Sequence, residues 1–148
     1  VRYIPSPWPT GPVEFSRTLD SRVFLLKLTP GMSPALIPEI FRLYDCVIVE
    51  SFGVGGLPGG DDGAMFAAVR DWCGAGHLAV FTTQVPHEGS DLAVYEVGRA
   101  AKALPGVLEA HDMTPEATAV KLMWVLGQTT DRAEAEKLFL TPVQWDIL

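Results

Sequence analysis

The chain is poor in basic residues, with 11 Lys and Arg against 18 Asp and Glu among its 148 residues, a formal net charge of −7. Nucleic-acid binding needs clustered Lys and Arg opposite the phosphates, so we expect no nucleic-acid partner. No signal peptide is recognisable, and no apolar run reaches the roughly 18 residues that a membrane span needs. These absences predict a soluble, cytoplasmic protein with no membrane partner.

Groups that bind metals are sparse as well. The cysteines, Cys46 and Cys73, lack the spacing of zinc ligands, and the histidines at 77, 87 and 111 form no i, i+4 pair. We therefore expect two buried free thiols, no metal site and no cofactor. Internal repeats and low-complexity segments are also lacking.

What the chain does have is enough apolar material, 48% of its residues, to bury the core of one domain. The first twenty residues stand apart because Pro5, Pro7, Pro9 and Pro12 interrupt any helix or strand ladder. We predict an extended interdomain connector over residues 1–20 and a single domain over residues 21–148.

Within this domain, short apolar runs alternate with helix-like segments. The runs that predict strands are Val23–Leu28, Cys46–Val49, Leu78–Phe81 and, weakly, Val107–Leu108. Helices are expected over about 35–44, 63–74, 91–104, 115–126 and 132–139, from apolar periodicity and from start signals at Ser33-Pro34, Asp61 or Asp62, Thr114-Pro115 and Asp131 with Glu134. This alternation favours an α/β fold, a Rossmann-like or flavodoxin-like three-layer sandwich in which helices flank a small parallel sheet.

In such a sheet the functional loops follow the carboxyl ends of the strands. Here those loops are Thr29–Gly31, Glu50–Pro58 and Thr82–Asp91, and we expect them to lie together. The glycines at 53, 55 and 56 have two interpretations. Their backbone N–H groups could hold an anion, although Pro58 replaces the last glycine of a dinucleotide fingerprint, or glycine could be required for a sharp strand-to-helix turn.

The same loops contain the candidate nucleophiles Ser51, Thr82 and Thr83, but no base is apparent at a suitable spacing. His87 and Glu88 could form a charged pair, and a solvated loop carboxylate is the alternative. On residue chemistry alone, no catalytic set is assigned to this chain.

Several short segments carry a resemblance to a known family. They are Leu26–Gly31, Glu50–Gly56, Thr82–Gln84, Glu88–Gly89, Tyr95–Gly98, Asp112–Ala117 and Lys121–Trp124. Together they resemble the carboxyl-terminal domain of bacterial type I, cytosolic L-asparaginases, from about Asp20 to about Phe139.

The resemblance implies half of an amidohydrolase that converts L-asparagine to L-aspartate and ammonia. In that family the catalytic threonines, aspartate and lysine belong to an amino-terminal domain, so the resemblance places no catalytic residue here and implies that the chain alone is inactive. The active site opens between domains of neighbouring subunits, which implies a homo-oligomer. In some members a glutamate in the loop after the third strand approaches the amino group of the substrate in the neighbouring subunit, and Glu88 is the match to it here.

Some type I enzymes also bind asparagine as an effector in this domain. The corresponding candidate effector or loop site here comprises Glu50, Ser51, Thr83 and Gln84. Three positions depart from that pattern: Glu50 replaces an arginine, Val85 a cysteine and Gly56 an asparagine. A carboxylate at position 50 would repel the carboxylate of the effector, so retention of the site in its usual form is not implied.

Two other functions stay open. One is the related asparaginase-like subunit of a tRNA-dependent amidotransferase, and the other is a small-molecule binding module without chemistry. The asparaginase hypothesis further predicts an exposed apolar surface and self-association.

Overall fold

Four parallel strands form the centre of the fold. The computed structural model describes residues 11–12, 15–58, 63–143 and 146–147. The strands are β1 (Val23–Lys27), β2 (Cys46–Ser51), β3 (Leu78–Thr83) and β4 (Val107–Glu109), hydrogen-bonded in the order β1-β2-β3-β4. Every side chain of β2 and β3 is buried, as continuous apolar runs covered on both faces require.

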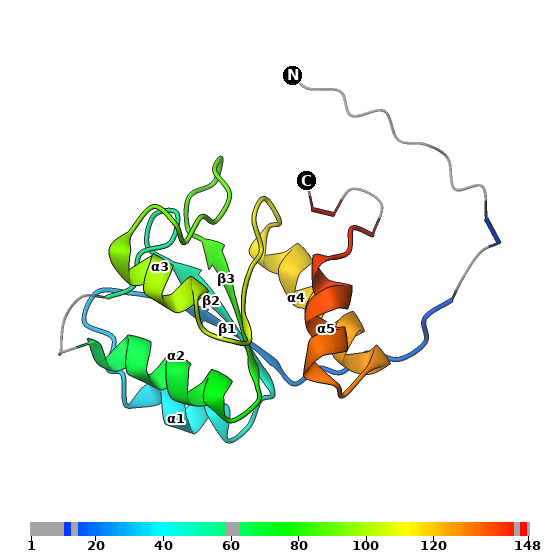
Figure 1. Ribbon diagram of the computed structural model, residues 1–148, viewed down its shortest axis with the longest axis horizontal. Helices are drawn as coiled ribbons and strands as arrows, with labels where there is room; N and C mark the ends of the chain where they lie inside the picture. Colours follow the sequence, from blue (N-terminus) through cyan, green and yellow to red (C-terminus); the bar gives the residue numbers. More distant parts are fainter. Residues whose placement is uncertain (1–10, 13–14, 59–62, 144–145, 148) are drawn as a thin grey trace.

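Helices cover both faces of the sheet (Figure 1). On one face lie α1 (Leu36–Phe41), α2 (Ala64–Gly74) and α3 (Glu96–Lys102), and on the other lie α4 (Pro115–Gln128) and α5 (Arg132–Leu140). Two cores result, one centred on residues such as Phe81 and Trp72 and the other on Leu122 and Phe139. The α/β three-layer arrangement is therefore confirmed, and its consecutive strand order places the first three crossover helices in one layer.

Two of the predicted N-cap side chains do begin a helix, and one does not. Thr114 Oγ1 accepts from Ala117 N at the start of α4, and Asp131 Oδ1 accepts from Glu134 N at the start of α5, as predicted. The predicted cap at Ser33 is wrong, because its Oγ accepts from Ala35 N within a turn and α1 begins only at Leu36.

Two other boundaries differ from the sequence pattern. α3 begins at Glu96 and not near Asp91, whose carboxylate accepts from Ala93 N in a turn. α4 continues through Gln128, past the glycine expected to end it. The alternative caps Asp61 and Asp62 lie outside the described residues, and α2 is preceded by Gly63.

The buried face of α4 is more polar than predicted. Thr118 and Lys121 are buried beside Leu122 and Val125, whereas Val120 is 63% exposed. The ammonium of Lys121 donates to the carbonyl of Thr141 at 3.0 Å and pairs with Asp146 at 2.8 Å, so it joins α4 to the segment after α5.

Both cysteines are buried free thiols, as predicted. Burial raises the pKa of the Cys73 thiol to about 11 and raises that of Cys46 further still. Neither is a reactive thiolate near neutral pH. Within the described residues, no helix is long and apolar enough to span a membrane.

Candidate functional site

The carboxyl ends of β1, β2 and β3 meet, as the sequence predicted. Glu50 is adjacent in register to Thr82 and Ser51 to Thr83, so polar residues of β2 and β3 lie side by side. Both strands extend two residues beyond their predicted ends, which places these groups in the sheet and not in loops.

Gln84 joins the ends of two strands. Its side-chain amide donates to the carbonyl of Leu28 at 2.7 Å and to the carbonyl of Glu50 at 3.0 Å. Its backbone N–H donates to Ser51 O at 3.2 Å. Because both amide donor bonds are made to the main chain, Gln84 shapes the site more than it offers a free donor.

The three candidate nucleophiles are not activated. Ser51 Oγ donates to Thr82 O at 2.8 Å, and Thr83 Oγ1 donates to Gly53 O while accepting from Val85 N. The hydroxyl of Thr82 is buried and forms no hydrogen bond to any described residue. Since none of these hydroxyls bonds to a His, Asp or Glu side chain, the described residues assemble no nucleophile–base pair here.

Glu50 is a buried carboxylate, 8% exposed, at the end of β2. Its Oε1 accepts from the ammonium of Lys27 at 2.9 Å, and the two residues are direct neighbours in the β1–β2 register. The ammonium side chain of Lys27 is largely exposed, so the negative charge of Glu50 is compensated from the solvent side.

A hollow of about 280 Å³ opens beside these residues. It is lined by Glu50, Thr83–Pro86, Glu88 and Asp112–Glu116. Three regions contribute, namely the end of β2, the end of β3 with the loop after it, and the loop from β4 into α4 with the first residues of that helix. The third loop was missed from the sequence because the run at Val107–Leu108 was too short to mark a strand end reliably.

Glu88 is exposed on the lining of this hollow. It forms no hydrogen bond or ion pair with any residue that the structure describes, His87 included, so the interpretation as a solvated loop carboxylate fits and the charged pair does not form. Its carboxylate is therefore available to a group outside the described chain.

The glycine-rich turn closes on itself and packs against main chain. Phe52 and Gly56 exchange backbone hydrogen bonds of 3.0 and 2.7 Å, and Gly53 has a φ of 51°. A Cβ on Gly55 would lie 2.8 Å from the carbonyl of Asp91. These contacts explain the glycines by turn conformation and close backbone approach, and they support that interpretation over anion binding.

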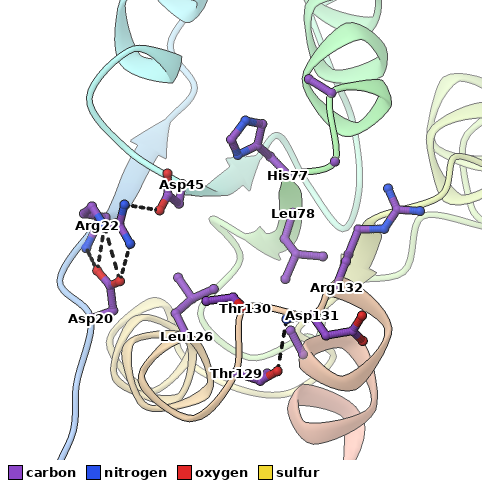
Figure 2. Close-up of a pocket in the computed structure, with 13 residues that line it drawn as sticks. Asp20, Arg22, Asp45, His77, Leu78, Leu126, Thr129, Thr130, Asp131 and Arg132 are labelled. Atoms are coloured by element: carbon purple, nitrogen blue, oxygen red, sulfur yellow. Dashed lines mark hydrogen bonds and ion pairs between the residues drawn. The ribbon is translucent and has the colours of Figure 1, made fainter.

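A second hollow, of about 270 Å³, lies at the opposite, amino end of the sheet (Figure 2). Three of its charged groups pair with one another, because Arg22 contacts Asp20 and Asp45, each at 2.6 Å. His77 lines this hollow and stacks on Trp72, with ring centroids 3.8 Å apart. No group of three or more His, Cys, Asp or Glu positioned for a metal ion occurs in the described part of the chain.

The fold and the polar hollow together define an α/β domain whose loops gather several carboxylates at the carboxyl end of a parallel sheet. Comparison with known proteins narrows this class. The chain is 41% identical over 124 residues to an L-asparaginase from Thermococcus kodakarensis, covering 84% of this chain and 37% of that protein. It is 35% identical over 130 residues to one component of the glutamyl-tRNA(Gln) amidotransferase from Metallosphaera sedula, covering 87% of this chain and 28% of that protein.

Comparison with solved structures also finds L-asparaginases. The thermostable L-asparaginase from Thermococcus kodakarensis superposes with a TM-score of 0.89 at 38% identity, covering all of this chain and 44% of that one. L-asparaginase I from Vibrio cholerae shares the fold, with a TM-score of 0.80 at 23% identity, covering 95% of this chain and 42% of that one.

Residues 22–139 match the Glutaminase/Asparaginase C-terminal domain, and the chain belongs to this family. It spans less than half the length of these relatives.

Proposed function

We propose that this chain is the carboxyl-terminal part of an L-asparaginase, which hydrolyses L-asparagine to L-aspartate and ammonia. Its strand-end loops complete an active site whose nucleophile comes from an amino-terminal domain. The chain by itself is then inactive, consistent with hydroxyls at 51, 82 and 83 that bond to no base. Residues 1–20 serve as the connector and residues 21–148 as the domain.

The observation that carries this proposal is the exposed carboxylate of Glu88 beside the hollow, in a chain 41% identical to an L-asparaginase over 124 residues. Asparagine presents an α-ammonium group, which needs an anionic partner when it leaves water. Glu88 has no partner among the described residues and supplies that charge to a neighbouring subunit.

The candidate effector or loop site at Glu50, Ser51, Thr83 and Gln84 stays part of the proposal. The side chains of Ser51, Thr83 and Gln84 bond to main-chain carbonyls and hold the loops, so Glu50, which is paired with Lys27, is the charged member of this site on the lining of the hollow. A cationic group of a ligand here would share that carboxylate with the ammonium of Lys27.

We also propose a cytoplasmic homo-oligomer. Val94, Tyr95 and Val97, at the start of α3, are each more than 40% exposed. Apolar side chains exposed so close together favour association with a partner surface. Light scattering at high protein concentration tests this proposal, and a strictly monomeric profile counts against it.

The deciding experiment measures ammonia release from L-asparagine. The chain alone is compared with a mixture that contains the separately expressed amino-terminal part of the Thermococcus kodakarensis L-asparaginase, and that part alone is the control. We expect activity only in the mixture. Activity of the isolated chain would reveal a nucleophile that the contacts above do not contain.

A component of a tRNA-dependent amidotransferase is the second candidate, supported by relatives from such enzymes at 31–35% identity. It predicts release of ammonia from glutamine in preference to asparagine. The same mixture assayed with both amino acids separates the two functions. A mixture silent with both would favour a small-molecule binding module.

A further inference from the structure

We propose that residues Thr18–Arg22 form a strap that fixes the direction in which the connector leaves the domain, so that a covalently linked amino-terminal domain is held in its productive position. This inference rests on the proposed function. The strap is defined by its contacts with α4 and with the amino end of the sheet.

The strap is anchored first at the carboxyl end of α4. Thr18 Oγ1 donates to the carbonyl of Gly127 at 2.9 Å, and the side-chain amide of Gln128 donates to Thr18 O at 3.1 Å. Glycine is required at position 127 when the strap is docked, because a Cβ at this position would overlap Thr18 O. A glycine inside a helix costs about 1 kcal/mol relative to alanine, and close approach of the strap accounts for its presence.

The second anchor lies about one helical turn earlier. Asp20 N donates to the carbonyl of Met123 at 2.8 Å, so the strap runs antiparallel to the last turns of α4. Two contacts spaced along one helix fix both a position and a direction, which a single hydrogen bond would leave open.

The third anchor is ionic and joins the strap to the sheet (Figure 2). Arg22 contacts the carboxylate of Asp20 on the strap and that of Asp45, which precedes β2, each at 2.6 Å. The strap is thereby attached both to α4 and to the segment that leads into β2.

These contacts contribute little burial. Thr18 and Arg22 are exposed, and the side chain of Leu19 is 67% exposed. A segment that buries so little apolar surface adds little to global stability, so its ordered path has another consequence, which is the direction of the chain that precedes it.

The test compares two arrangements of the same partners. In cis, the amino-terminal part of the Thermococcus kodakarensis enzyme is fused before residue 1, and in trans it is mixed with the 148-residue chain. Gly127→Ala and Thr18→Val release the strap, whereas Thr18→Ser keeps the hydroxyl and Val120→Ala changes an exposed site on the same helix. Hydrogen exchange at the Asp20 amide reports directly whether the strap is docked.

We expect the two releasing variants to lower asparaginase activity in cis by roughly tenfold or more, since misplacement of about 1 Å can cost 10²-fold. Activity in trans should change by less than about twofold, because no connector then links the domains. Thr18→Ser and Val120→Ala should match the parent chain in both arrangements.

Equal losses in cis and trans, or an unchanged cis activity with the Asp20 amide deprotected, would overturn the inference. An Asp20 amide that exchanges freely in the parent chain would overturn it as well. A parent chain inactive in both arrangements would instead contradict the proposed function, while the exchange measurement still decides whether the strap is docked.

Discussion

The two ends of the sheet differ in whether their charged side chains find partners within the chain. At the amino end, Arg22 pairs with both neighbouring carboxylates, so the charges are compensated within the chain. At the carboxyl end, neutral side chains such as Gln84 bond to the main chain and Glu50 pairs with the exposed ammonium of Lys27, whereas Glu88 is left without a described partner.

This difference suggests a structural role for the amino end and a binding role for the carboxyl end. Groups that satisfy one another hold the chain in place, and the amino end accordingly carries the proposed strap. A carboxylate without an internal partner gains most from an external cation, and the carboxyl end accordingly carries the proposed substrate contact.

The largest change in the free energy of unfolding is expected from a comparison of two glycines. Each of them lies against a backbone carbonyl. A Cβ on Gly98 would overlap the carbonyl of Leu92, a residue with no exposed surface, and the matching contact of Gly127 is with the exposed Thr18. Gly98→Ala should lower the free energy of unfolding by at least about 2 kcal/mol, since buried main chain cannot yield. Gly127→Ala should change it by less than about 1 kcal/mol, because the strap can move away.

Urea denaturation of both variants checks this prediction. Losses of equal size would show that the strap is as integral to the fold as the packing of α3 on Leu92, and the contrast between the two ends would fail.

A smaller loss of stability is expected when a glutamine at each end of the sheet is replaced. Gln84→Ala removes donors to two partly buried carbonyls, for an expected loss of about 2 kcal/mol. Gln128→Ala also removes bonds to carbonyls, but these are exposed to water and the loss should stay below about 0.5 kcal/mol. Thermal unfolding measures both, and a reversed order would contradict the assignment of Gln84 as the residue that holds the strand ends.

The smallest effect concerns pH. Hydrogen bonding from Arg22 lowers the pKa of Asp20 below its ordinary value of 3.8. The resulting stabilisation is therefore present above that value and is lost as the pH falls through the lower folded-state pKa. Arg22→Gln should flatten the dependence of stability on pH in that acidic range, as measured by urea unfolding across a pH series. An unchanged dependence would show that the pair contributes nothing measurable.

The strands were predictable because a parallel strand covered on both faces must be apolar throughout, as Cys46–Val49 and Leu78–Phe81 are. The start of α4 was predictable from Thr114-Pro115, whose cap is local. The start of α3 was not, because Leu92 N donates to the carboxylate of Glu109, a contact 17 residues away in the chain.

The site was predictable in part. Parallel topology alone brings the ends of β2 and β3 together, so their polar residues could be grouped in advance. The bond from Gln84 to Leu28 O and the pairing of Lys27 with Glu50 depend on which strands are neighbours, and spacing along the chain does not encode that order.

The most direct measurement is the KM for L-asparagine of Glu88→Gln in the mixture with the amino-terminal part, with Asp71→Asn as a control carboxylate 70% exposed on α2. Our account predicts that Glu88→Gln raises KM by roughly tenfold or more, equivalent to about 1.4 kcal/mol of lost binding, with the control unchanged. A KM equal to that of the parent mixture would contradict the assignment of Glu88 to the substrate.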